Sequence, residues 1–200
     1  MKLTIISAIA IATVLILGNS CRSAEANDPE NSISQDSSVS SAEMIERGGY
    51  LVTIGGCNDC HTTKVMTPYG MGFDSSKMLA GHIANPQAPK PGKDVFKPGN
   101  WGGMDPMATA FAGPWGISYA ANLTPDVETG IGSWKESDFI NTLRTGRHLG
   151  VENGRELLPP MPWFNFAKGT DEDLKAIFAY LQSLKPIKNK VPAASPPAQL

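Results

Sequence analysis

The chain has 200 residues, of which 41% are hydrophobic and 18% charged, a composition typical of one globular domain with accessory segments. Its 17 basic and 19 acidic residues give a formal net charge of −2 without any basic stripe, so we expect no nucleic-acid partner. The 20 glycines and 16 prolines predict many turns and little regular sheet.

The first twenty residues predict an export signal. An apolar run from Leu3 to Gly18 follows a positively charged start and has the length of a secretory hydrophobic region. Residues 17–21, Leu-Gly-Asn-Ser-Cys, resemble a bacterial lipobox in which Cys21 is lipidated, although Gly18 stands where leucine is usual. The alternative is ordinary cleavage, with Cys21 removed or left as a free thiol. We therefore expect a signal peptide at 1–20 and a location in the periplasm or cell envelope, anchored by lipid to a membrane.

A polar segment separates this leader from the folded domain. Residues 21–41 are rich in serine and poor in apolar residues, so we expect a flexible tether, lipid-anchored or free. The domain itself is expected at 42–190, followed by a disordered tail at 191–200, with fraying already from Pro186. Apolar residues spaced three and four apart predict a first helix over 42–54, and a glycine on its apolar stripe, Gly48, indicates close approach by another helix.

The five residues Cys57-Asn58-Asp59-Cys60-His61 form the pattern C-x-x-C-H, the attachment signature of c-type haem. Two thiols on one helical turn can each bond a vinyl group of one porphyrin, and His61 can then serve as the proximal iron ligand. A structural zinc site would need two further ligands at partner spacing, and the only other cysteine is Cys21. A thioredoxin-like site would need a βαβ context that the flanking residues do not offer. The sequence therefore predicts one covalently attached haem c.

Residues 62–115 look irregular, and the 84–107 stretch is especially rich in proline and glycine. We expect a long loop with one short helix near residues 107–111, which covers a haem edge or forms a docking face. A capping box that begins at Ser133 predicts a helix to about Thr145. A second capping box, at 170–173, predicts a final helix to about Leu184.

The sixth iron ligand is less clearly marked. Met161 is the first candidate, because prolines on both sides restrict the backbone that carries its sulfur. The alternative is that Met161 only fills the core, as methionines commonly do. His82 and His148 are other candidate ligands, although an ordinary polar role suits both. Trp134 can donate its indole N–H to a haem propionate or simply pack at the edge of the core.

Further motifs resemble a known family. Beside C-x-x-C-H, the sequence holds Pro-Trp-Gly-x-x-Tyr-Ala-x-Asn-Leu-Thr-Pro-Asp at 114–126, Thr-Gly-Ile-Gly-x-Trp at 129–134, Leu-Pro-x-Met-Pro-Trp at 158–163 and Thr-Asp-Glu-Asp-Leu-x-Ala-Ile-x-Ala-Tyr-Leu at 170–181. Over roughly residues 43–190 the chain resembles the class I cytochrome c domains that serve as electron-transfer subunits of bacterial periplasmic alcohol, aldehyde and gluconate dehydrogenases.

The resemblance implies an all-α cytochrome c fold, with three to five helices wrapped round one haem and a long Pro/Gly-rich loop. It implies that Met161 is the sixth ligand and that the first and last helices cross, with Gly48 against Phe178 or Tyr180. This chain departs from the family in having a single C-x-x-C-H and a longer loop at 84–107.

The function that follows is electron transfer, without chemistry on a substrate. The carrier would shuttle electrons between a dehydrogenase or quinol-side donor and a terminal acceptor such as an oxidase or another cytochrome. The alternative is a haem enzyme, a peroxidase or small-molecule reductase, with an open distal site and an acid–base group such as His82 or His148 above the iron.

Overall fold

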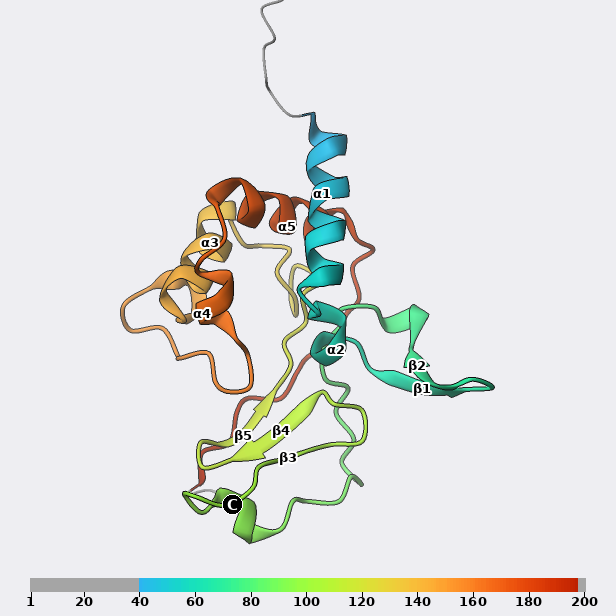
Figure 1. The fold of residues 1–200 in the computed structure, drawn as a ribbon, viewed down its shortest axis with the longest axis vertical. Helices are drawn as coiled ribbons and strands as arrows, with labels where there is room; N and C mark the ends of the chain where they lie inside the picture. Colours follow the sequence, from blue (N-terminus) through green and yellow to red (C-terminus); the bar gives the residue numbers. More distant parts are fainter. Residues whose placement is uncertain (1–39, 198–200) are drawn as a thin grey trace, which may run out of the picture. The chain divides into compact units, whose positions relative to one another are not determined.

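The computed structural model describes residues 40–197, and Figure 1 shows its elements in chain order. The predicted signal peptide, the lipidation site Cys21 and the tether up to residue 39 lie outside the described residues. The helices are α1 (Ser41–Ile54), α2 (Cys57–His61), α3 (Glu136–Thr145), α4 (Trp163–Phe166) and α5 (Asp171–Ser183), with short 3-10 helices at Ser75–Lys77, Lys93–Phe96 and His148–Gly150. Across residues 40–197, no helix has the length and hydrophobicity needed to cross a bilayer.

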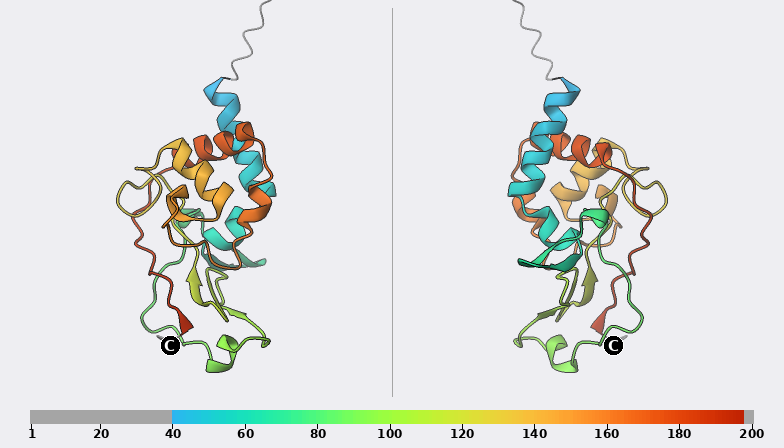
Figure 2. Two further views of the ribbon diagram at one scale, coloured as in Figure 1. Left: turned by 90° about the vertical axis from the view of Figure 1, so that its left-hand side faces the viewer. Right: turned by 90° about the vertical axis from the view of Figure 1, so that its right-hand side faces the viewer.

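Helices α1 and α5 cross at a glycine, as the resemblance implied (Figure 2). A Cβ at Gly48 would lie 1.9 Å from the backbone oxygen of Ala176 and 2.7 Å from the Cβ of Tyr180, so only glycine permits this approach. The contact is with Tyr180, one of the two partners expected for Gly48. Both helices start with hydrogen-bonded caps, because Ser40 Oγ accepts from the Glu43 N–H at 3.2 Å and Thr170 Oγ1 from the Asp173 N–H at 3.1 Å.

Helix α3 starts three residues later than the predicted capping box at Ser133. The chain is still turning at that point, since the Trp134 N–H donates to the Ile131 carbonyl. The cap is provided instead by Asp138, whose carboxylate accepts from the Lys135 N–H at 2.9 Å. The buried apolar residues that these helices share form one cluster, which we call the helical core: Val52, Leu79, Ile131, Phe139, Leu143, Leu174, Ile177 and Leu181.

The expectation of an all-α fold is confirmed only in part, because two small antiparallel sheets accompany the helices. One is the hairpin of β1 (Lys64–Thr67) and β2 (Gly70–Phe73), and the other joins β3 (Gly103–Met104), β4 (Ala110–Gly113) and β5 (Gly116–Tyr119) in that order. Residues 84–102 between them are a long loop as predicted, with one 3-10 turn at Lys93–Phe96.

The prediction of a helix near residues 107–111 is wrong, because this segment leads into strand β4. Ala108 adopts a left-handed conformation with φ 52°, which interrupts any helix there. The carboxylate of Asp105 accepts hydrogen bonds from the backbone N–H groups of Thr109 and Ala110, at 2.6 and 2.8 Å. This side chain therefore replaces helical hydrogen bonds and turns the backbone into the strand.

The chain after α5 is ordered by contacts where fraying was expected. Residues 185–195, which we call the C-terminal strap, run in extended conformation away from α5 (Figure 1). The backbone of Ser195 exchanges two hydrogen bonds with Ile117 of β5, at 2.8 and 3.0 Å. The prediction of a frayed tail is therefore wrong for the strap, because the backbone of the strap is hydrogen-bonded to strand β5.

Candidate haem site

Helix α2 presents both cysteines and His61 on a single turn, directly after α1 (Figure 1). Gly56, with φ 66°, makes the turn between the two helices, a conformation that favours glycine. Both thiols are unpaired and half-buried. Burial raises the pKa of the Cys57 thiol to about 11, and burial also raises the pKa of Cys60. The structure thus offers two neutral thiols three positions apart on one helix, which is the sequence spacing of a haem-attachment motif.

The ring of His61 is held by the main chain of a distant segment. Its Nδ1 lies 2.7 Å from the carbonyl oxygen of Ala121, which requires the proton to be on Nδ1. The Nε2 lone pair is then directed away from this contact and is available to a metal, an arrangement usual for metal-bound histidines. Burial lowers the pKa of His61, so the neutral imidazole is favoured. These features fit a haem ligand.

The loop after α2 is tied back to the helix by a buried threonine, Thr62, that no sequence motif singled out. The hydroxyl of Thr62 donates to Asn58 Oδ1 at 2.7 Å and accepts from the Leu79 N–H at 2.8 Å. Thr62 is fully buried. The Gly81 N–H donates to the His61 carbonyl at 2.8 Å, so His61 is held through both its ring and its backbone. Only the position of Thr62, next to the C-x-x-C-H pattern, marked it in the sequence.

Met161 and Cys57 both pack against the helical core while remaining partly exposed. The segment before Met161 is fixed by Ser118, whose hydroxyl donates to the Pro159 carbonyl at 2.5 Å. Among the other methionines, Met66 and Met104 are 78% and 68% exposed, which suits surface positions better than an iron ligand. The structure thus brings Met161 to the same core as Cys57, and its bond to iron stays a prediction.

The remaining candidate residues have protein partners. His82 Nδ1 is 2.9 Å from Thr109 Oγ1, and its ring packs against that of Tyr119 at a tilt of 42°, with centroids 4.8 Å apart. Trp134 packs against the helical core and meets the ring of His148 edge-on, with centroids 5.2 Å apart. These contacts suit structural roles for both histidines. The predicted propionate contact of Trp134 remains a prediction.

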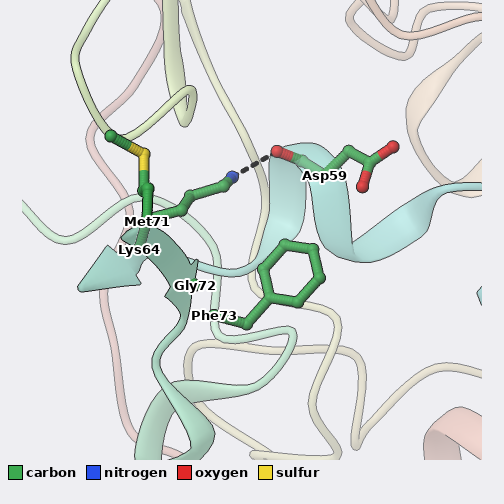
Figure 3. Close-up of a pocket in the computed structure, with 5 residues that line it drawn as sticks. All are labelled: Asp59, Lys64, Met71, Gly72 and Phe73. Atoms are coloured by element: carbon green, nitrogen blue, oxygen red, sulfur yellow. Dashed lines mark hydrogen bonds between the residues drawn. The ribbon is translucent and has the colours of Figure 1, made fainter. Parts of the chain in front are cut away.

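A shallow pocket of about 270 Å³ lies between α2 and the β1–β2 hairpin (Figure 3). It is lined by Asp59, Lys64, Met71, Gly72 and Phe73. The ammonium group of Lys64 donates to the backbone carbonyl of Asp59 and lies 5.7 Å from the centre of the Phe73 ring. These contacts join the hairpin to the helix that carries the cysteines, and the lining includes neither His61 nor Met161.

Comparison with known proteins confirms the resemblance to cytochrome c subunits of bacterial dehydrogenases. The chain is 31% identical over 166 residues, 83% of its length, to the gluconate 2-dehydrogenase cytochrome c subunit of Pantoea cypripedii. It is 29% identical over 196 residues, 98% of its length, to the fructose dehydrogenase cytochrome subunit of Gluconobacter japonicus. It is also 28% identical over 160 residues, 78% of its length, to the cytochrome c subunit of the alcohol dehydrogenase (quinone) of Gluconobacter oxydans.

The chain is much shorter than these relatives. It spans 26% of the length of the gluconate 2-dehydrogenase subunit, 30% of the fructose dehydrogenase subunit and 25% of the alcohol dehydrogenase subunit. No family model matches the sequence. The named cytochrome subunits imply a cytochrome c fold, which agrees with the crossing of α1 and α5 and with the C-x-x-C-H on α2.

Proposed function

We propose that this protein is an electron carrier, free or as a subunit of a dehydrogenase complex, that uses one covalently bound haem c. The observation that carries the proposal is helix α2, where two neutral thiols share one turn with a histidine whose Nε2 is free. Similarity to the cytochrome c subunits of gluconate and fructose dehydrogenases supports the same role.

Different side chains would make different bonds to such a haem. Cys57 and Cys60 would form the two thioether bonds, and His61 Nε2 and the Met161 sulfur would bind the iron. The haem supplies one-electron chemistry between ferric and ferrous iron. A thioether ligand favours the ferrous state, and the apolar side chains of the helical core keep water away. Trp134 would donate its indole N–H to a propionate.

The partners belong to the same proposal. A dehydrogenase or another quinol-side protein would donate electrons, and an oxidase or another cytochrome would accept them, in encounters as weak as redox contacts usually are. The names of the similar subunits support a dehydrogenase partner. A lipid on Cys21 and the 21–41 tether would keep the domain in the cell envelope near membrane partners, which raises their effective concentration. The protein would then carry electrons without acting on a substrate.

The test is the visible spectrum of the haem-loaded protein, wild type against Met161→Ala. Ferric iron bonded to a thioether gives a weak charge-transfer band in the red, and we expect this band in the wild type and its loss in the variant. Met104→Ala is the matched control, because Met104 is 68% exposed and the band should survive there. We also expect reduced wild type to bind carbon monoxide slowly and Met161→Ala to bind it readily. Rapid binding to the wild type at neutral pH would instead favour an open distal site, as in a haem enzyme.

A further inference from the structure

The C-terminal strap contacts the backbone on both sides of His61. On one side, the Asn189 side-chain amide donates to the carbonyl of Ala80 at 2.7 Å and to that of His82 at 3.0 Å. The residue between these two carbonyls is Gly81, whose N–H donates to the His61 carbonyl. A single side chain on the strap thus fixes the short segment that holds the His61 backbone.

On the other side, the strap is bonded to the segment that holds the His61 ring. Asn122 follows Ala121, and its amide nitrogen donates to the Ile187 carbonyl at 2.8 Å. Its Oδ1 accepts from the N–H and the hydroxyl of Thr124, at 2.9 and 2.7 Å. The Thr124 hydroxyl in turn accepts from the Ile187 N–H at 3.1 Å. Asn122 and Thr124 are almost completely buried, so water does not substitute for these bonds.

The two segments that hold His61 need this support because neither belongs to a helix or a sheet. They are joined to each other by two backbone bonds, from the His82 N–H to the Ala120 carbonyl and from the Leu123 N–H to the Leu79 carbonyl. Irregular backbone obtains its remaining partners from side chains, and a buried carbonyl left without a partner destabilises the folded state. Without the strap, the carbonyls of Ala80 and His82 would lose their Asn189 donor.

We propose that Asn189 and Asn122 are positioning residues for His61, the histidine that would bind the iron. They clamp the segments at 79–82 and 120–123 between the strap and α2, and thereby hold the Ala121 carbonyl at hydrogen-bonding distance from His61 Nδ1. The inference rests on the proposed function, because it takes His61 as the iron ligand. It adds that the C-terminal strap controls the orientation of that ligand.

The experiment compares haem-loaded full-length wild type with Asn189→Ala. In the reduced protein, labelled with ¹⁵N-histidine, NMR reports the chemical shift of His61 and the hydrogen exchange of its Nδ1 proton. Loss of two hydrogen bonds, each with a net value near 1 kcal/mol, should speed that exchange roughly tenfold or more. We also expect a changed reduction potential, because this hydrogen bond sets the electron donation of the imidazole. Helix content should not change.

Lys188→Ala is the matched control on the same strap. Lys188 forms an ion pair with Glu128 at 2.6 Å, in which both side chains are 70% exposed, so it should leave exchange and potential unchanged. A second variant, Thr129→Val, removes the acceptor of the Asn189 backbone N–H, which lies 3.0 Å away, and leaves the Asn189 side-chain bonds in place. It also removes the bond that the Thr129 hydroxyl donates to Asp126 at 2.7 Å and the one it accepts from the Asn122 amide at 3.3 Å. This variant should also speed the exchange of the His61 Nδ1 proton, and it provides the test of the positioning role if Asn189→Ala does not fold.

Two failures are distinguishable. If wild-type His61 resonates at the position of a free imidazole, it is no iron ligand and the proposed function falls together with this inference. If wild-type His61 is shifted by the haem and protected, yet the Asn189 and Thr129 variants exchange as slowly as the Lys188 control, only the positioning role is overturned.

Discussion

Cys57 and Cys60 lie on one turn of α2, and in the proposed function each thiol forms its own thioether bond to the haem. We expect Cys60→Ser to keep its haem through Cys57 alone, with one vinyl group left unsaturated. In alkaline pyridine, the reduced haem of the variant, still attached to the denatured protein, should then absorb at longer wavelength than that of the wild type. The double variant Cys57→Ser/Cys60→Ser should lose nearly all haem on a denaturing gel. Haem that stays on the double variant would contradict covalent attachment through this motif.

Asp173 gives the fold a pH dependence. Arg47 donates two hydrogen bonds to one oxygen of its carboxylate, and this contact lowers the pKa of Asp173 below its ordinary value of 3.8. A lowered pKa stabilises the folded state above that ordinary value, and the stabilisation is lost as the pH falls through the lowered pKa. The ion pair is partly exposed, so we expect Asp173→Asn to cost at most about 1 kcal/mol at pH 7.

The measurement is the free energy of unfolding of wild type and Asp173→Asn from pH 7 down to pH 2. The difference between the two proteins should shrink once the pH drops below 3.8. Lys97→Ala serves as a control, because it breaks an exposed ion pair with Asp94 inside the long loop. A difference that stays constant down to pH 2 would show that the Asp173 carboxylate is not stabilised by Arg47.

Among the elements, the crossing of α1 and α5 depends most on a single position. Gly48→Ala would place a methyl group 1.9 Å from the Ala176 carbonyl oxygen, which is backbone and has no freedom to rotate away. The helices must then separate, so we expect a loss of about 1–3 kcal/mol in the free energy of unfolding.

Gly49→Ala is the neighbouring control for this prediction. Its new Cβ would meet the end of the Tyr180 ring at 3.0 Å, a side chain that can shift, while the helix gains propensity. Denaturant unfolding of the two variants should therefore give a clear loss for Gly48→Ala and little change for Gly49→Ala. Equal losses would contradict a tight crossing at Gly48.

The helices were predictable from the sequence because their signals are local. The apolar spacing of α1 and the capping box of α5 lie within the elements themselves, and the predicted bounds differ from the structure by about one residue. The predicted start of α3 was too early, because the sequence suggested a cap at Ser133. In the structure the cap is Asp138, a residue in the first turn of the helix, which accepts from the Lys135 N–H. Strand β4 was missed because the conformation of Ala108 and the hydrogen bonds of Asp105 determine it, and neither leaves a periodic pattern.

At the scale of the whole molecule, the sequence predicts candidate haem residues but does not show which segments hold them in place. The C-x-x-C-H pattern is complete within five residues, so its chemistry can be read without a fold. The partner of the His61 ring lies 60 residues away, at Ala121, and it is a backbone carbonyl, which no residue type reveals. The strap was expected to fray because its prolines and polar residues lack apolar spacing. Its hydrogen bonds come from Asn189 and from backbone groups.

The strap is also synthesised later than the helix that carries His61. Asn189 and its partner Ala80 are separated by 109 residues, and a ribosome adds roughly 5–20 residues each second. For several seconds after α2 has been made, the clamp around His61 has no Asn189 to close it. The thiols of the nascent chain therefore face their surroundings during this interval with less protein around them than at any later moment.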